Sequence, residues 1–312
     1  MRDLRTTTPQ RLSALTFYHP AMQEVVLDAA RLAGAEIWRS WAAREVRPGA
    51  PPTVSVERDG LVRSLTARLV VAADGRSSSA RGWGKFNARR GSQKLFGAGA
   101  LLENFPRSDD TGLFLTNSDV GRAAFIFPQR NGRARAYLCC GGDLNRLQGE
   151  QDKPRFVEES IKSGMPAEIY EGACLQGPLA SFDMTETWVD HPYRDGLALI
   201  GDAAGSSDPT WGQGLSLTSR DVRVLAEKLL STNDWHTAAH SYAEDHDPYF
   251  NVTREVGQWL FDLFLARGPE YDRLRERALP RLMTEPDRVP DHVWSGPEMP
   301  FDEDVRKRFY GE

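Results

Sequence analysis

Two short runs of apolar residues stand out because each ends abruptly at an acidic residue. The first run, Leu69–Ala73, is followed directly by Asp74, and the second, Leu197–Ile200, is separated from Asp202 by a single glycine. Continuous apolar runs of this length are typical of strands buried on both faces, as in a parallel sheet. We therefore predict two inner strands whose carboxyl ends carry Asp74 and Asp202.

A loop and then a helical pattern follow the second run. The loop contains Asp208-Pro209 and Gly212-Gln213-Gly214, and apolar residues then recur from position 215, mostly on one broad helical face. A carboxylate at a strand tip can accept hydrogen bonds from ribose-type hydroxyls, and glycines that open a helix leave N–H groups for an electron-rich ligand. We interpret residues 197–230 as an anion- and hydroxyl-binding corner. The alternative is an ordinary strand–loop–helix connection in which Asp202 is a turn residue.

The remaining patterns predict helices near both ends of the chain and a strand-rich middle. Helical periodicity covers residues 20–33, 152–163, 166–171 and 235–267, and the last of these could be interrupted at Asp247-Pro248. Strand patterns cover residues 35–38, 53–58, 61–73, four runs between 94 and 140, and a run that ends at Trp188-Val189.

Composition limits the classes of protein that the chain can belong to. A net charge of −5 argues against nucleic-acid binding, and no apolar run approaches the length that spans a bilayer. Three cysteines form no disulfide framework, so we expect a reducing, cytoplasmic location. His236 and His240 lie one helical turn apart, but they lack the His-Glu-x-x-His pattern, and we predict a solvated helix and no metal site.

The corner at residues 197–230 resembles the second FAD-binding motif of the p-hydroxybenzoate hydroxylase-like flavoprotein monooxygenases. The matching positions and their immediate neighbours are Gly201, Asp202, Ala203, Pro209, Gly212, Gln213, Gly214 and Leu215. The resemblance implies that the aspartate binds the ribityl or ribose part of FAD, while the proline and the Gly-Gln-Gly loop lie against the isoalloxazine ring. Gly205 and Ser216 replace a histidine and an asparagine that many members carry.

The first acidic strand tip resembles a second motif of the same family, Asp-Gly-x-x-Ser-x-x-Arg. The matching residues are Asp74, Gly75, Ser78 and Arg81. From the residues alone, Asp74 could cap the following turn and Arg81 could neutralise a phosphate, or the segment could be a capped helix with a surface arginine. The resemblance implies that the motif serves the pyrophosphates of FAD and NAD(P)H indirectly. The resemblance thus implies that Asp74 and Asp202 serve the same bound flavin nucleotide, near Gly212–Gly214.

The resemblance, over residues 17–265, implies an α/β fold: an FAD/NAD(P)-binding Rossmann-like domain of the GR2 type with an inserted antiparallel β-sheet substrate domain and a C-terminal helix. The boundaries that we predict are 1–92 and 191–232 for the FAD-binding domain, 93–190 for the substrate domain, and 233–312 for the helix and tail. The family's opening Gly-x-Gly-x-x-Gly turn does not occur before Pro20, so we expect an N-terminally incomplete domain, either truncated or a remnant, whose isolated product is poorly soluble and colourless. His19 stands where the family has an FAD-contacting arginine, and it either keeps that contact or only starts a helix.

The function implied by the resemblance is hydroxylation of a small organic substrate by an FAD-dependent monooxygenase, with NAD(P)H as reductant. One alternative is a flavin-dependent reductase or dehydrogenase of the same fold that acts on prenyl chains. Another is a non-catalytic remnant that acts as a binding protein. The sequence assigns no catalytic acid or base, no particular substrate and no oligomeric state.

Overall fold

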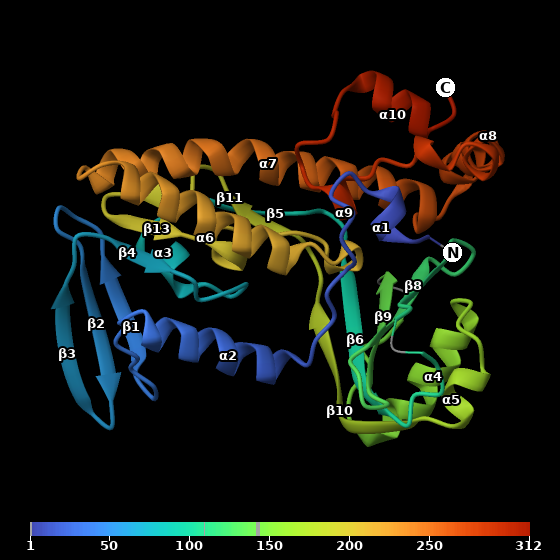
Figure 1. The fold of residues 1–312 in the computed structure, drawn as a ribbon, viewed down its shortest axis with the longest axis horizontal. Helices are drawn as coiled ribbons and strands as arrows, with labels where there is room; N and C mark the ends of the chain where they lie inside the picture. The colour runs from blue at the N-terminus through green and yellow to red at the C-terminus, as the bar shows by residue number, and fades with distance from the viewer. Residues whose placement is uncertain (1, 109, 142–143) are drawn as a thin grey trace. The chain divides into compact units, whose positions relative to one another are not determined.

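The computed structural model describes residues 2–108, 110–141 and 144–312 (Figure 1). The chain forms two compact units, each built from segments that are distant in sequence. Unit 1 comprises the residues up to Gly34 together with Gln93–Met184 and Val256–Glu312, and unit 2 comprises Ala35–Ser92 and Thr185–Glu255. No helix in the described part of the chain is both long enough and apolar enough to cross a membrane.

Unit 1 is centred on a five-stranded antiparallel sheet in the order β10-β6-β9-β8-β7. Its strands are β6 (Leu95–Glu103), β7 (Leu113–Asn117), β8 (Arg122–Pro128), β9 (Ala134–Gly141) and β10 (Cys174–Asp183). The short helices α4 (Lys153–Lys162) and α5 (Glu168–Glu171) bring Phe156 and Ile169 into the apolar core of this sheet. The strand-rich block predicted between residues 94 and 140 is therefore confirmed, as are the two helices that follow it.

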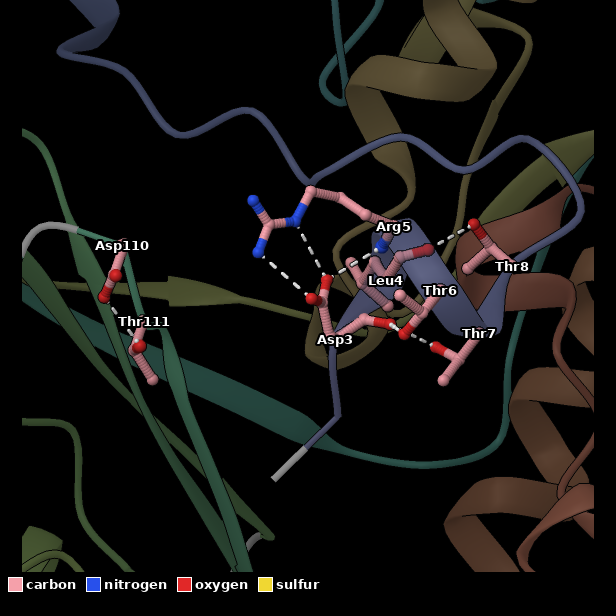
Figure 2. Close-up of polar contacts among 8 residues, drawn as sticks. All are labelled: Asp3, Leu4, Arg5, Thr6, Thr7, Thr8, Asp110 and Thr111. Carbon is pink, nitrogen blue, oxygen red and sulfur yellow. Dashed lines mark hydrogen bonds and ion pairs between the residues drawn. The ribbon is translucent and has the colours of Figure 1, made fainter.

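The ends of the chain supply the other helices of unit 1. They are α1 (Leu4–Thr7), α2 (His19–Leu32), the last part of α7 (Trp235–Phe264), α8 (Pro269–Thr284), α9 (His292–Ser295) and α10 (Glu303–Phe309). Asp3 caps α1 through the backbone N–H of Arg5, and the hydroxyls of Thr6 and Thr7 donate to the Asp3 carbonyl (Figure 2). The helix α2 agrees with the predicted one, but none of its residues is buried.

Unit 2 contains three small sheets, each of three strands. The first is β1 (Ala42–Arg47), β2 (Thr53–Arg58) and β3 (Leu61–Thr66); the second is β14 (Gly205–Ser206), β11 (Thr187–Val189) and β5 (Ala88–Arg90); the third is β12 (Tyr193–Arg194), β13 (Leu197–Leu199) and β4 (Val70–Ala72). The helices of unit 2 are α3 (Ser79–Trp83), α6 (Gly214–Ser231) and the first part of α7. The helices α6 and α7 run side by side, and Val224, Leu225, Tyr242 and Ala243 pack between α6, α7 and β13 (Figure 1).

Three local predictions need correction. Residues 35–38 form no strand, because the backbone turns at Ser40, with a φ of +65°, and the strand begins only at Ala42. The run 61–73 is two strands in different sheets: β3 ends at Thr66, where its partner β2 begins opposite it, and β4 starts at Val70 beside β13. The helix α7 continues through Pro248, because its buried neighbours Tyr249 and Phe250 are packed, and this packing outweighs a cost of about 3 kcal/mol.

Candidate functional site

The two acidic strand tips lie side by side in unit 2. Strands β4 and β13 pair in parallel, with Ala72 opposite Leu199, and the Ile200 amide donates to the Ala72 carbonyl at 3.0 Å. Parallel neighbours end at the same edge of a sheet, so Asp74 and Asp202 emerge at the same edge. The two predicted strands are therefore paired, but only β13 is an inner strand: β4 lies at the edge of its sheet and its Val71 is 41% exposed, so the prediction of a second inner strand is wrong.

The segment after β4 folds into a capped helical turn. The Asp74 carboxylate accepts a hydrogen bond from the Ala80 amide at 3.1 Å, and the Ser78 hydroxyl accepts one from the Arg81 amide at 3.2 Å. Both bonds satisfy backbone N–H groups at the start of α3 that have no partner inside the helix. The capping role predicted for Asp74 is therefore confirmed.

Arg81 is buried, with 8% of its surface exposed, and it ties α3 to the segment after β13. Its Nε donates to the Ala203 carbonyl at 2.7 Å, its Nη2 donates to the Asp202 carbonyl, and its Nη1 reaches the Arg76 carbonyl at 3.3 Å. Burial lowers the pKa of Arg81, while the carboxylates of Asp74 and Asp202 act in the opposite direction. These guanidinium donors point at the protein's own backbone, so Arg81 is not a surface arginine.

Asp202 lies in a 3₁₀ turn, Gly201–Ala203, directly after β13. Gly201 has a φ of +58°, and a Cβ at this position would meet the Thr218 hydroxyl at 2.8 Å, so the tight turn requires glycine. The Asp202 carboxylate is half-buried and lies 3.9 Å from the place where a Cβ on Gly214 would be. Burial raises the pKa of Asp202, and the positive charges of Arg76 and Arg81 oppose the increase.

The loop between this turn and α6 contains a buried aspartate and a glycine with free space beside it. Asp208 is buried and its carboxylate accepts the Thr210 amide at 2.9 Å, which starts the turn Pro209–Trp211. Burial raises the pKa of Asp208 to about 6. Gly212 has a φ of +69°, and no atom lies within 4 Å of the place where its Cβ would be. The loop therefore leads through Gly212 to the first turn of α6, where Gly214 lies close to the Asp202 carboxylate.

The site thus combines a carboxylate at the end of a strand with glycines at the start of a helix. A comparison with known families accounts for this geometry. The sequence matches the profile of an FAD binding domain over residues 5–243, more than half of the chain. The chain belongs to the p-hydroxybenzoate hydroxylase-like FAD-binding family. The Rossmann-like α/β class predicted from the sequence is thereby confirmed.

Individual relatives within and around this FAD-binding family span two kinds of reaction. The chain is 28% identical over 240 residues to a digeranylgeranylglycerophospholipid reductase of Methanopyrus kandleri, covering 73% of this chain and 56% of the relative. It is 27% identical over 247 residues to an uncharacterized aromatic compound monooxygenase of Bacillus subtilis, covering 71% of this chain and 46% of the relative. The chain thus spans about half the length of these relatives.

A solved structure shares the fold. The p-nitrophenol 4-monooxygenase of Pseudomonas putida superposes with a TM-score of 0.70 at 21% identity, covering 90% of this chain and 73% of that chain. At this identity the likeness concerns the fold alone.

The residues at the strand tips fit the FAD that this family binds. Gly212 is exposed and Gly214 half-buried, and neither place where a Cβ would be has a neighbour closer than 3.9 Å. The half-buried carboxylate of Asp202 is available to hydroxyl groups, and Ser207 has a buried hydroxyl without a hydrogen-bond partner among the described residues. The site therefore offers room for close approach together with polar atoms that a polyhydroxylated ligand can satisfy.

Sequence reasoning missed two charged residues that shape this corner. Arg76 opposes the upward pKa shifts of both Asp202 and Asp208 through its positive charge. Asp221 is 1% exposed and accepts the Gly201 amide at 2.7 Å. Its position was a usable signal, because a charged residue four positions from both Leu217 and Leu225 lies on the apolar face of α6.

The histidines of α7 are engaged in pairwise hydrogen bonds. His236 Nδ1 lies 2.7 Å from the Tyr193 hydroxyl, and His240 Nδ1 lies 2.8 Å from His191 Nε2. Within the ranges that the structure describes, no group of three or more histidine, cysteine or acidic residues is arranged to hold a metal ion. His19 is the first residue of α2 in unit 1, and its role toward FAD stays a prediction.

Proposed function

We propose that this chain is the FAD-binding and substrate-binding part of a monooxygenase that uses NAD(P)H to hydroxylate a small organic substrate. The observation that carries the proposal is the Asp202 turn, which α3 and β13 hold beside the open start of α6. Membership of the FAD-binding family supports the cofactor, and the aromatic compound monooxygenase relative supports the reaction class.

The proposed roles of the site residues follow from their surroundings. Asp202 accepts hydrogen bonds from ribityl or ribose hydroxyls, and Gly212 and Gly214 let the ligand approach the backbone. Pro209, Gln213 and Leu215 line the same loop, while Gly201 and Ala203 form the turn that carries Asp202. When bound, FAD supplies the redox chemistry, and the protein's part is to orient the reactants and to exclude water.

For the first motif we propose an indirect role. Asp74 and Gly75 shape the turn before α3, and Arg81 fixes the backbone of Asp202 and Ala203 instead of reaching a phosphate. Arg81 is therefore proposed as a positioning residue for the cofactor site.

FAD titration followed by flavin fluorescence tests the proposal. We expect the purified chain to bind FAD, and Asp202→Ala to weaken binding about tenfold or more, because a hydrogen bond to a charged group contributes roughly 1.5–3 kcal/mol. Asp190→Asn is the matched control, since Asp190 is 53% exposed and pairs with Arg89. Equal FAD affinity in Asp202→Ala and in the control would contradict the assignment.

The reductase relative favours a second candidate, a flavin-dependent reduction of prenyl chains. The two reactions differ in their use of oxygen. A monooxygenase consumes one O2 for each NAD(P)H when its substrate is hydroxylated, whereas a reductase oxidises its electron donor without O2. An oxygen electrode used together with NAD(P)H absorbance therefore separates them, and a chain that binds FAD but turns over neither way is the binding protein of the third alternative.

A further inference from the structure

The turn that carries Asp202 is also contacted by a buried carboxylate of α6, that of Asp221, which accepts a hydrogen bond from a backbone amide of the turn. Asp221 is 1% exposed; its Oδ2 accepts the Gly201 N–H at 2.7 Å, and its Oδ1 accepts the hydroxyl of Tyr249. Burying an ionised group costs free energy unless its hydrogen bonds replace those of water. The two donors provide that replacement, and one of them belongs to the peptide that enters the Asp202 turn.

The same face of α6 restricts Gly201 sterically. Thr218, three positions before Asp221, would meet a Cβ on Gly201 at 2.8 Å, and its hydroxyl is held by the Gly214 carbonyl at 3.0 Å. Residues three apart on a helix are neighbours, so Thr218 and Asp221 act on one peptide from one surface. Gly201 is therefore held by one hydrogen bond to α6, and Thr218 leaves no room there for a larger residue.

Arg81 holds the opposite side of the same turn. It donates to the carbonyls of Asp202 and Ala203, whereas Asp221 accepts from the amide of Gly201. In this turn of three consecutive residues, Gly201 is thus bound through its amide from α6, and Asp202 and Ala203 are bound through their carbonyls from α3. The backbone that carries the Asp202 side chain is thus hydrogen-bonded on both sides without a ligand.

Groups on α7 and α6 surround the Asp221 carboxylate. Tyr242, His246 and Tyr249 face it from α7, and Tyr242 also donates to the Leu199 carbonyl at 2.8 Å, next to the turn. Burial raises the pKa of Asp221, while these hydrogen bonds and His246 act against the increase. Arg220, Asp245 and Asp247 are the nearby charges that act on its tyrosine partners.

We propose that Asp221 is a positioning residue for the cofactor: through the Gly201 amide it orients Asp202 toward the hydroxyl groups of the FAD ribityl or ribose chain. This inference rests on the proposed function, because it gives Asp202 its ligand. It predicts that Asp221, which lies outside the loop proposed to contact FAD, contributes measurably to the affinity for FAD.

The test compares three variants by FAD titration and by amide hydrogen exchange of the FAD-free chain. In Asp221→Ala the Gly201 amide loses its acceptor, so we expect roughly tenfold weaker FAD binding and faster exchange at residues 200–204. Asp221→Asn keeps an acceptor for Gly201, and its amide can donate to Tyr249, so we expect most of the affinity and protection to return. Glu227→Gln, on the exposed part of α6, is the control and should match the wild type.

The outcomes separate this inference from the proposed function. If the wild-type chain binds no FAD, both proposals fail. If it binds FAD and Asp221→Ala binds equally well, only the positioning role is overturned. A general rise of exchange throughout α6 and α7 in Asp221→Ala, with Asp221→Asn no better, would also overturn it, because Asp221 would then serve the packing of the helices alone.

Discussion

Arg81 shows how one side chain can organise a site without touching the ligand. Its planar group presents five donors in a fixed arrangement, and in this chain they reach the carbonyls of Arg76, Asp202 and Ala203. Lysine offers three donors on a single nitrogen, so it cannot reach the carbonyls that arginine contacts from three separate nitrogens. The requirement is therefore for arginine and not simply for positive charge.

We predict that Arg81→Lys lowers the free energy of unfolding by about 2–3 kcal/mol, because buried carbonyls lose their donors. Urea unfolding measures the change. Arg89→Lys is the matched control, since Arg89 is 55% exposed and should change stability by less than about 0.5 kcal/mol. Equal stability of the two variants would show that the Arg81 contacts contribute little.

Asp208 gives unit 2 a pH-dependent stability. Its pKa is about 6 in the folded chain and 3.8 in a model peptide, so the folded state binds a proton more tightly than the unfolded state. The associated stability is complete below about pH 4 and is lost as the pH rises through 6. Asparagine keeps the acceptor for the Thr210 amide and removes the charge.

We therefore predict that Asp208→Asn is more stable than the wild type at pH 7, by up to ~3 kcal/mol, and that this advantage disappears near pH 4. Glu186 contributes to this difference, because the negative charge of Asp208 raises the pKa of Glu186 and the substitution removes that charge. Denaturant unfolding at several pH values measures the difference between the two proteins. A constant difference across this range would contradict the role given to Asp208.

At the scale of elements, the start of α6 is where backbone geometry and ligand access meet. Gly214 is the first residue of the helix, and a methyl group there would lie 3.9 Å from the Asp202 carboxylate without touching other protein atoms. The ligand-free chain can therefore accept alanine at this position. A ligand that approaches Gly214 needs the space that the alanine methyl group would fill.

We predict that Gly214→Ala unfolds no more easily than the wild type, because alanine favours helices by up to about 1 kcal/mol over glycine, yet binds FAD about tenfold or more weakly. Ser219→Ala, exposed further along α6, is the control and should keep the wild-type affinity. Thermal unfolding and fluorescence titration supply the two measurements. Unchanged FAD affinity in Gly214→Ala would indicate that the ligand does not approach this glycine.

The same elements show how far the sequence could predict the structure. Apolar runs identified the positions of β4 and β13, but the inference that both are buried on both faces held only for β13, because an apolar run does not show which strand will lie at the edge of a sheet. The division of residues 61–73 into two sheets was missed because β3 pairs with its neighbour β2, whereas the partner of β4 is β13, far along the chain. The roles of Arg81 and Asp221 were missed for the same reason: each depends on a partner twenty or more positions away.

At the scale of the whole chain, the candidate site belongs entirely to unit 2. Ligand binding stabilises the parts of a protein that contact the ligand against local opening. We predict that FAD slows amide exchange most strongly in residues 69–82 and 197–217, and least in β8 and β9 of unit 1. Exchange measured by mass spectrometry with and without FAD tests this, and equal protection of β8 and β9 would contradict it.

The bond from Arg81 to Ala203 joins residues 122 positions apart, and Gln93–Met184 of the other unit lies between them in the chain. The ribosome must therefore synthesise the whole of Gln93–Met184 before Arg81 can form its hydrogen bonds to Asp202 and Ala203. Contacts of such long sequence separation are slow to form, because a large loop has to be ordered first. A nascent chain that pauses before residue 203 carries an open, charged strand tip, and it is at that stage of translation that chaperones would have most to protect.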